Sequence, residues 1–312
     1  MQVLFITSTR IGDAVLSSGL LDALLLRHPN ARLTIACGPL AAPLFAEVPG
    51  LERLHVVRKK PGHRHWLELW RATVGRRWDL VIDLRRSGLA YFLRAGERRR
   101  LPQASGPIHR VTLLGRVLGL DPPPAPRLWT NLDHEAAARA LAPDDKPLLV
   151  TAPTANWLGK TWPAERFAAL AERLLPGARV LVCCGPGEGS QAMPVLEGLD
   201  EGRGRLVEGE ALLTLYALFA RARLFVGNDS GLMHLAAAAG APTLGLFGPS
   251  PDALYAPWGP NCAVVRTPES MEQLIGTPGF DYDTTGSLMT GLTVDTVEQA
   301  AKALLARTES PP

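Results

Sequence analysis

The sequence predicts an α/β protein with two domains, each built on a parallel sheet that helices cover on both faces. The chain has 312 residues, which is long for a single hydrophobic core. In both halves, short apolar runs of strand length alternate with segments of helical apolar spacing, and this alternation is typical of parallel sheets. A proline-rich stretch at 121–126 divides the halves, because proline lacks an amide donor and does not continue a helix.

The expected elements follow from these runs. In the first half, we expect strands at 3–8, 33–37, 54–57 and 80–84, with a helix at 14–27. After the proline-rich stretch, we expect a helix at 134–141, strands at 148–151, 180–184, 224–227 and 243–247, and helices at 164–174, 211–220, 232–239 and 294–305. An irregular loop at 267–291 is expected before the last helix.

This pattern predicts the domain organisation. We expect a first domain of residues 1–145, a second of residues 146–291, and a C-terminal segment, 292–312, whose helix packs back on the first domain. Ligands of open parallel sheets bind beyond the carboxyl ends of the strands. Both domains are therefore expected to face a central cleft.

The composition is that of an ordinary globular protein, and no run of about eighteen apolar residues suggests a membrane span. The chain starts directly with a strand-like run rather than with the features of a signal peptide. Four cysteines, Cys37, Cys183, Cys184 and Cys262, lack metal-site spacing and are expected to be free buried thiols. We therefore expect a cytoplasmic protein.

Charge is distributed unevenly along the chain. Residues 1–145 carry 21 Lys and Arg against 13 Asp and Glu, whereas residues 146–312 carry 12 against 17. A basic first half favours an anionic partner, such as a phosphorylated acceptor, a membrane surface or nucleic acid. Nucleic acid is the least favoured because no recognition motif accompanies the charge. A solvated, arginine-rich surface is the alternative.

The strongest motif is the run at 224–250, in which a strand passes through a tight turn into a helix of small residues. Asp229 or Ser230 can serve as the helix N-cap, and the free amides at the helix start favour a phosphate. Gly231 allows close approach of a ligand, and His234 shares the helical face of Ser230. An ordinary capped helix with a buried histidine is the alternative for each residue alone.

This run resembles the donor-binding signature of glycosyltransferase family 9, the lipopolysaccharide heptosyltransferases. The family pattern G-x-D-[TS]-G-x-x-H-x-x-A-A and its F-G-P-[TS] turn are matched by Gly227, Asp229, Ser230, Gly231, His234, Ala237, Ala238, Phe247, Gly248, Pro249 and Ser250. Tyr255, Pro257 and Gly259 continue the family's usual tail. The family more often has Thr in place of Ser230, a change that keeps the hydroxyl. The resemblance implies a GT-B fold, with two Rossmann-like domains around the cleft.

A second match lies near the start of the chain, where Gly12 and Asp13 follow the first strand. Glycosyl transfer with inversion needs a base that takes the proton of the acceptor hydroxyl. The resemblance assigns this role to Asp13. The alternative is a carboxylate that only stabilises the helix dipole.

A third match is the family's K-x-W-P, present as Lys160, Trp162 and Pro163. Pro163 fits the first position of the next helix. Lys160 is expected to neutralise the leaving diphosphate and Thr154 to donate a hydrogen bond to it. Some heptosyltransferases carry paired threonines where this chain has Pro153 and Thr154, which leaves recognition of the donor sugar open.

A glycine-rich loop at 185–190 follows the strand at 180–184. Alone, it suggests a dinucleotide fingerprint, with Glu208 or Glu210 as the ribose-binding acid, although Pro186 and Ser190 depart from the pattern. The family places a Gly-x-x-Glu segment near the nucleoside, so Glu188 is a candidate for the donor ribose. Asp281 and Asp283 resemble the D-x-D of metal-dependent transferases, but a solvated turn is expected there.

Together the matches imply an inverting, metal-independent transfer of a sugar from a nucleoside diphosphate. The family implies ADP-heptose as donor and a lipid A–core intermediate as acceptor, with neither a metal nor another cofactor. Arg10, Arg85 and Arg86 are candidates for the acceptor, together with the cluster at 98–100, and peripheral contact with the cytoplasmic face of the inner membrane is expected. The alternatives are a non-catalytic protein that binds a sugar nucleotide and an NAD(P)-dependent oxidoreductase.

Overall fold

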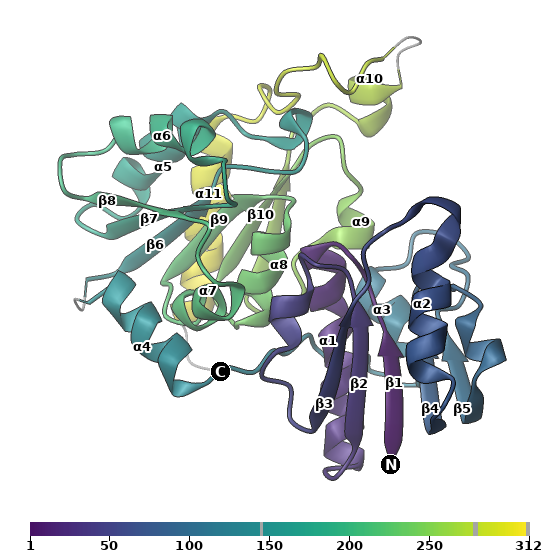
Figure 1. The fold of residues 1–312 in the computed structure, drawn as a ribbon. Helices are drawn as coiled ribbons and strands as arrows, with labels where there is room; N and C mark the ends of the chain where they lie inside the picture. The colour runs from purple at the N-terminus through teal and green to yellow at the C-terminus, as the bar shows by residue number, and fades with distance from the viewer. Residues whose placement is uncertain (144–145, 277–279, 310–312) are drawn as a thin grey trace. The chain divides into compact units, whose positions relative to one another are not determined.

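The computed structural model describes residues 1–143, 146–276 and 280–309, and the chain divides into two compact units (Figure 1). The first unit is Met1–Asn131, and the second begins at Leu132. Each unit contains one parallel sheet with helices packed on it. The predicted α/β class with two parallel sheets is confirmed.

The first unit has a sheet of order β3-β2-β1-β4-β5. Its strands are β1 (Gln2–Ile6), β2 (Arg32–Cys37), β3 (Leu51–Val56), β4 (Arg77–Asp83) and β5 (Arg94–Arg100). Its helices are α1 (Ile11–Arg27), α2 (Arg64–Thr73) and α3 (Arg110–Gly115), with short 3-10 turns η1 (Ala42–Phe45), η2 (Pro61–His63) and η3 (Leu89–Phe92).

The central strand of this sheet is β1, which pairs with β2 on one side and with β4 on the other. Four of its five residues are buried, as its apolar sequence QVLFI requires. The strands that follow β1 are added first on one side of it, as β2 and β3, and then on the other side, as β4 and β5. Such a switch point leaves a crevice beyond the carboxyl ends of the strands. The turn that leads into α1 lies at that position.

The second unit has a sheet of order β11-β10-β9-β6-β7-β8. Its strands are β6 (Leu148–Ala152), β7 (Arg179–Cys184), β8 (Gly204–Glu208), β9 (Leu224–Asn228), β10 (Thr243–Phe247) and β11 (Cys262–Arg266). Its helices are α4 (Leu132–Leu141), α5 (Ala164–Leu174), α6 (Gly189–Glu197), α7 (Leu212–Phe219), α8 (Gly231–Ala238), α9 (Asp252–Tyr255), α10 (Met271–Ile275) and α11 (Val294–Glu309), with a 3-10 turn η4 (Leu158–Lys160).

In this second sheet, the pairing of β6 with β9 places Ala152 beside Gly227, and the pairing of β9 with β10 places Asn228 beside Leu246. The segments that leave these three strands therefore start at one sheet edge. The switch point lies between β6 and β9, because β6 pairs with β7 on its other side. The two motifs that follow β6 and β9 meet at this point.

The division between the units lies earlier than the expected boundary after residue 145, and residues 144–145 themselves lie outside the described part. Helix α4 packs on α7, and the guanidinium of Arg221 donates to Ala142 O at 3.0 Å. The proline-rich stretch packs on α1, where an added Cβ at Gly19 would lie 2.7 Å from Pro124 O. Thus α4 belongs with the second sheet and the prolines with the first.

Helix α11 also differs from its expected place. It packs on α5 and β11 of the second unit, and Val297, Ala301 and Leu304 are buried in that unit's core. Arg173 of α5 forms an ion pair with Asp295 at 2.6 Å. The apolar face that suggested packing on the first domain is covered by the second; residues 310–312 lie outside the described part.

Strand β5 is absent from the sequence-based expectations because its sequence, RAGERRR, is almost entirely polar. It is an edge strand that pairs with β4 alone.

Within the described residues, no helix is both long and apolar enough to cross a bilayer.

All four cysteines are free, as predicted, although Cys262 is only partly buried. Burial raises the pKa of the Cys37 thiol to about 12. This thiol is therefore protonated and unreactive at neutral pH.

Candidate functional site

In the second unit, an ion pair joins the K-x-W-P motif to the motif at 224–250. Lys160 Nζ lies 2.6 Å from Asp229 Oδ2, and the two side chains are 22% and 10% exposed. Lys160 ends η4, in the segment after β6, and Asp229 immediately follows β9. The topology of the sheet thus brings two predicted donor-binding residues into direct contact.

Asn228, the last residue of β9, forms hydrogen bonds with the segment that carries Lys160. It is fully buried, its Oδ1 accepts from Trp162 N at 3.0 Å, and its Nδ2 donates to Pro153 O at 2.7 Å. One amide side chain therefore links the segment before Thr154 to the segment after Lys160. Asn228 is not among the residues predicted for the site; its signal in the sequence is a polar residue at the end of an apolar strand.

Trp162 is a structural anchor for the same loop. It is buried, packs edge-on against Phe167 at 4.9 Å between ring centroids, and its Nε1 donates to Leu292 O at 2.8 Å. Pro163 is the N-cap residue of α5, whereas it was predicted to be the first helical residue; the helix begins one position later, at Ala164. The buried Trp162 of K-x-W-P therefore anchors the loop that carries Lys160.

Helix α8 starts beside this ion pair. Ser230 is its N-cap residue, as predicted, but the hydroxyl makes no capping hydrogen bond. The Oγ atom is buried and has no hydrogen-bond partner among the residues that the structure describes. Gly231 is the first helical residue, and His234, which is buried, follows one turn later. The amides of the first turn and the Ser230 hydroxyl remain available for an anion.

Thr154, the remaining predicted donor residue after β6, is also buried. Gly227, the residue before the end of β9, is required by packing, since an added Cβ would lie 3.1 Å from Ala152 Cβ and 2.8 Å from the ring of Phe225. The two strands therefore approach closely where the donor motifs begin.

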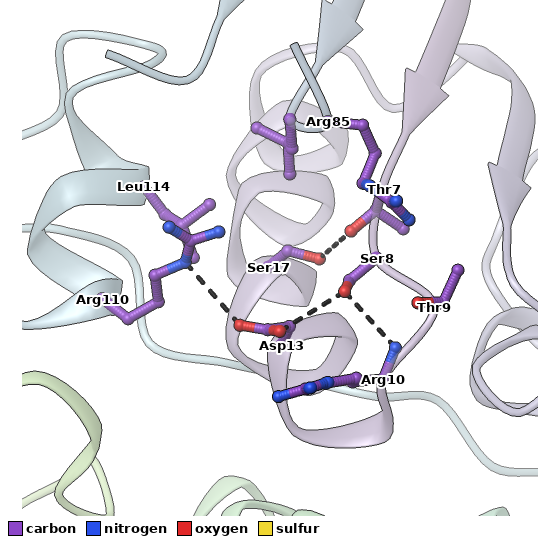
Figure 2. Close-up of a pocket in the computed structure, with 10 residues that line it drawn as sticks. Thr7, Ser8, Thr9, Arg10, Asp13, Ser17, Arg85, Arg110 and Leu114 are labelled. Carbon is purple, nitrogen blue, oxygen red and sulfur yellow. Dashed lines mark hydrogen bonds and ion pairs between the residues drawn. The ribbon is translucent and has the colours of Figure 1, made fainter. Parts of the chain in front are cut away.

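The first unit carries a pocket of about 300 Å³ at its switch point (Figure 2). Its lining comes from the turn after β1, from α1, from the segment after β4, and from α3: Thr7, Ser8, Thr9, Arg10, Asp13, Ser17, Leu84, Arg85, Arg110 and Leu114. Asp13 is the only carboxylate in this lining, against three arginines. The three arginines attract an anion to this pocket, and the Asp13 carboxylate can accept a proton there.

Asp13 stands in the first turn of α1, as predicted. Ser8 Oγ donates to its Oδ2 at 3.4 Å, and Arg110 Nε lies 3.8 Å from its Oδ1 (Figure 2). The carboxylate is about one-quarter exposed. It is thus held from two sides and remains open to a ligand in the pocket.

Comparison with known proteins decides the family. The family model described as Glycosyltransferase family 9 (heptosyltransferase) matches residues 99–275, more than half of the 312 residues. This chain belongs to glycosyltransferase family 9. The predicted membership and the predicted glycosyltransferase class are therefore confirmed.

Individual relatives span most of this glycosyltransferase. Lipopolysaccharide heptosyltransferase 2 of Salmonella typhimurium is 25% identical over 310 residues, which cover 85% of this chain and 88% of that protein. The structure of a family 9 glycosyl transferase from Veillonella parvula matches with a TM-score of 0.79 at 24% identity, covering 98% of this chain and 97% of that chain. The structure of E. coli ADP-heptose lps heptosyltransferase II matches with a TM-score of 0.79 at 20% identity, covering 99% and 100%. These matches confirm the predicted GT-B fold of two Rossmann-like domains.

The glycine-rich loop of this family 9 protein is not arranged for a dinucleotide. Glu208 Oε1 accepts from Gly187 N at 2.7 Å and from Gly189 N at 3.3 Å, and Glu188 Oε2 accepts from Gly185 N at 2.9 Å. A pyrophosphate bound in the dinucleotide manner would need these amides. Two carboxylates already occupy them, which argues against the oxidoreductase alternative.

Asp281 forms a turn, as expected for the D-x-D-like segment. Its carboxylate accepts from Asp283 N and from Thr284 Oγ1, each at 2.9 Å. The backbone hydrogen bond from Asp283, aided by the Thr284 hydroxyl, lowers the pKa of Asp281. Across the described residues, no three His, Cys, Asp or Glu side chains gather as metal ligands would.

The three arginines predicted for the acceptor separate in the structure. Arg10 and Arg85 line the pocket, whereas Arg86 lies outside its lining, with a left-handed backbone at φ 52°. Buried Asp83 fixes this loop by accepting from Arg85 N at 3.0 Å and from Ser87 Oγ at 2.8 Å. The direction of the turn therefore selects one of two adjacent arginines.

Arg110 takes the third place in the pocket and was not identified from the sequence. It is the first residue of the short helix α3, which packs on α1, and no motif marks it. Its position depends on tertiary packing, and only its charge was available as a signal.

The side chains of the arginine cluster at 98–100 interact with neighbouring groups of the first unit. The guanidinium of Arg98 donates to the carbonyls of Ala90, Ala95 and Leu93 at 2.8, 3.0 and 2.7 Å. Arg99 pairs with Glu97, and Arg100 contacts the hydroxyl of Tyr91. The expectation that this cluster meets acceptor phosphates is therefore not supported for Arg98, whose donors are engaged.

Proposed function

We propose that this glycosyltransferase moves a heptose from ADP-heptose to an anionic lipopolysaccharide-core or lipid A-type acceptor, with inversion and without a metal ion. The supporting observation is the site at the start of α8, where the Lys160–Asp229 ion pair adjoins helix amides and the Ser230 hydroxyl, which has no hydrogen-bond partner in the described part of the chain. The names of the Salmonella and E. coli relatives support the donor and the acceptor class.

The second unit binds the donor in this proposal. The diphosphate accepts hydrogen bonds from the Gly231 amide and Ser230 Oγ, and its charge is offset by Lys160 and by the positive end of α8. His234 and Thr154 complete the diphosphate site, while Asp229 holds Lys160 in place. Glu188, anchored by the amide of Gly185, accepts hydrogen bonds from the ribose.

The first unit binds the acceptor and supplies the base. The acceptor hydroxyl oxygen attacks the anomeric carbon on the face opposite the diphosphate. The new glycosidic bond forms as the bond between that carbon and the diphosphate oxygen breaks; the hydroxyl proton goes to Asp13, and the electron pair leaves with ADP. Arg10 and Arg85 attract the anionic acceptor, with Arg110 beside them in the pocket.

Metal independence follows from the donor site proposed above. The charge that develops on the leaving ADP is met by a lysine and by preorganised amides, which serve the purpose that a divalent cation serves elsewhere. We also propose peripheral contact with the cytoplasmic face of the inner membrane, where a lipid-linked acceptor would be presented.

A donor screen tests this function. Calorimetry with ADP-, GDP-, UDP- and dTDP-sugars, each with and without a chelator, is expected to give the tightest binding for ADP-heptose and no effect of the chelator. Tighter binding of another nucleotide sugar, or loss of donor binding on chelation, would overturn the donor or the metal-independent part of the proposal.

A further inference from the structure

The first unit exposes several large apolar side chains on one surface. Phe92, Tyr91 and Leu67 are 73%, 61% and 46% exposed. We call these three residues the apolar ridge. Large apolar side chains that are exposed to water and lie together mark an interaction surface.

The ridge lies on two elements, α2 and η3, which are joined by a hydrogen bond. Trp70 Nε1 of α2 donates to the carbonyl of Phe92, at the end of η3, at 3.1 Å. Leu67 lies three residues before Trp70 and shares its helical face. Beneath them, Leu69 of α2 and Leu93 after η3 belong to one buried cluster. The side chains of the ridge therefore project from a fixed base.

Three carbonyls around η3 are held by a single side chain, since Arg98 donates to the carbonyls of Ala90, Leu93 and Ala95. Arg100 of the same strand packs its guanidinium over the ring of Tyr91, 5.1 Å from the centroid. The polar strand β5 thus positions the ridge, which explains part of its unusual arginine content.

Exposed basic side chains lie on the elements that carry the ridge and on the segments next to them. They are Arg64 and Arg71 of α2, Arg85 and Arg86 in the loop before η3, and Arg94, the first residue of β5. The acidic Glu68 of α2 is paired with Lys60 at 2.7 Å. An apolar centre with a cationic rim is complementary to a surface that is apolar inside and anionic outside.

We infer that the apolar ridge docks this protein on a bilayer that contains anionic lipid. Aromatic and leucine side chains enter the interface between headgroups and acyl chains, while the surrounding arginines pair with headgroup phosphates. A folded protein partner lacks this layered match, and a second copy of the same cationic rim would repel the first.

Arg85 connects this surface to the pocket. Its guanidinium lies 5.9 Å from the ring centroid of Trp66 on α2, and the same residue lines the pocket that contains Asp13. Docking through the ridge therefore places a lipid-linked acceptor at the mouth of the pocket. The ridge gives the peripheral membrane contact of the proposed function a specific surface, and this last step rests on that proposed function.

Vesicle sedimentation of the full chain tests the inference. Vesicles of phosphatidylcholine alone are compared with vesicles that also contain phosphatidylglycerol. The Leu67→Gln/Phe92→Ser double variant is expected to bind the anionic vesicles at least about 10-fold more weakly than wild type, equivalent to about 1.4 kcal/mol. Leu26→Gln is the matched control, because Leu26 of α1 is 73% exposed and lies outside the ridge.

Two results would overturn the inference: wild type that does not bind anionic vesicles, or a double variant that binds them as wild type does. A change of oligomeric state in the double variant would assign the ridge to a second copy instead. Donor affinity and transfer to a water-soluble, delipidated acceptor are expected to be unchanged in the double variant. These two assays separate a failure of the docking surface from a failure of the proposed function.

Discussion

Lys160 Nζ and Asp229 Oδ2 lie 2.6 Å apart although 69 residues separate them in the sequence. The pair closes the sheet edge at which β6 and β9 end, because each residue belongs to the segment that leaves one of these strands. It keeps a cation beside the start of α8 before any donor arrives. The proposed donor site is therefore preorganised, and we expect this to lower the cost of binding a diphosphate.

Replacing Lys160 separates its electrostatic role from its structural one. Lys160→Met should weaken ADP binding by roughly 10- to 100-fold, as expected for loss of a charge-assisted hydrogen bond. It should also lower stability by about 1–3 kcal/mol, because the largely buried carboxylate of Asp229 loses its partner. Calorimetry and urea unfolding measure the two effects. Lys160→Met/Asp229→Asn should recover stability but not affinity; recovery of both would contradict the assignment of Lys160 to the diphosphate.

Asn228 is expected to be the main polar support of the donor loops. Asn228→Ala leaves Trp162 N and Pro153 O without their partner in a buried site, and should cost about 2–4 kcal/mol of unfolding free energy. Asn261→Ala is the control, because the Asn261 amide donates to Gly240 O at an exposed site. Equal losses of stability in the two variants, measured by urea unfolding, would show that the buried amide has no special role.

The Ser230 hydroxyl should matter for binding and not for folding. Because it makes no capping hydrogen bond, Ser230→Ala should change stability by less than about 0.5 kcal/mol while it weakens ADP binding. Ser270 provides the comparison, since its hydroxyl does cap α10 by accepting from Gln273 N at 3.2 Å. Ser270→Ala should lower stability and leave ADP affinity unchanged. The opposite ranking of the two variants in either assay would refute this division.

His55 should make the first unit less stable in mild acid. Burial, together with the nearby charges of Arg53 and Arg76, lowers the pKa of His55 from its usual 6.5. Below about pH 6.5 the unfolded state then binds a proton that the folded state does not, so stability falls as the pH falls through this window toward the folded pKa. His55→Gln should lose less stability than wild type between about pH 7.5 and 5.5. Parallel pH profiles of unfolding free energy would argue against this role.

The sequence predicts the strands that are buried on both faces, because β1, β6, β9 and β10 read as nearly continuous apolar runs. It does not predict β5, since an edge strand can be polar and is stabilised by pairing with β4. The expected partner of α11 was wrong for a related reason. An apolar helical face shows that a helix packs, but the choice between two sheets is made by tertiary fit.

The candidate site divides in the same way. The motifs mark Asp13, Lys160, Asp229 and Ser230. These residues lie in the segments that follow strand ends, where the sheet topology determines which segments meet. Arg110 depends on how α3 packs on α1, and no local pattern encodes that contact. The glycine-rich loop misleads in the other direction, because the carboxylate that occupies its amides, Glu208, comes from the next strand.

The most direct measurement is the turnover of Asp13→Asn together with its affinity for ADP. We expect affinity within about twofold of wild type and turnover lower by roughly 10²- to 10⁴-fold, because only the proton acceptor is removed. Asp22→Asn, on the same helix but paired with Arg127 at 3.3 Å, should retain full turnover. Wild-type turnover in Asp13→Asn would contradict the central claim that this carboxylate takes the acceptor's proton.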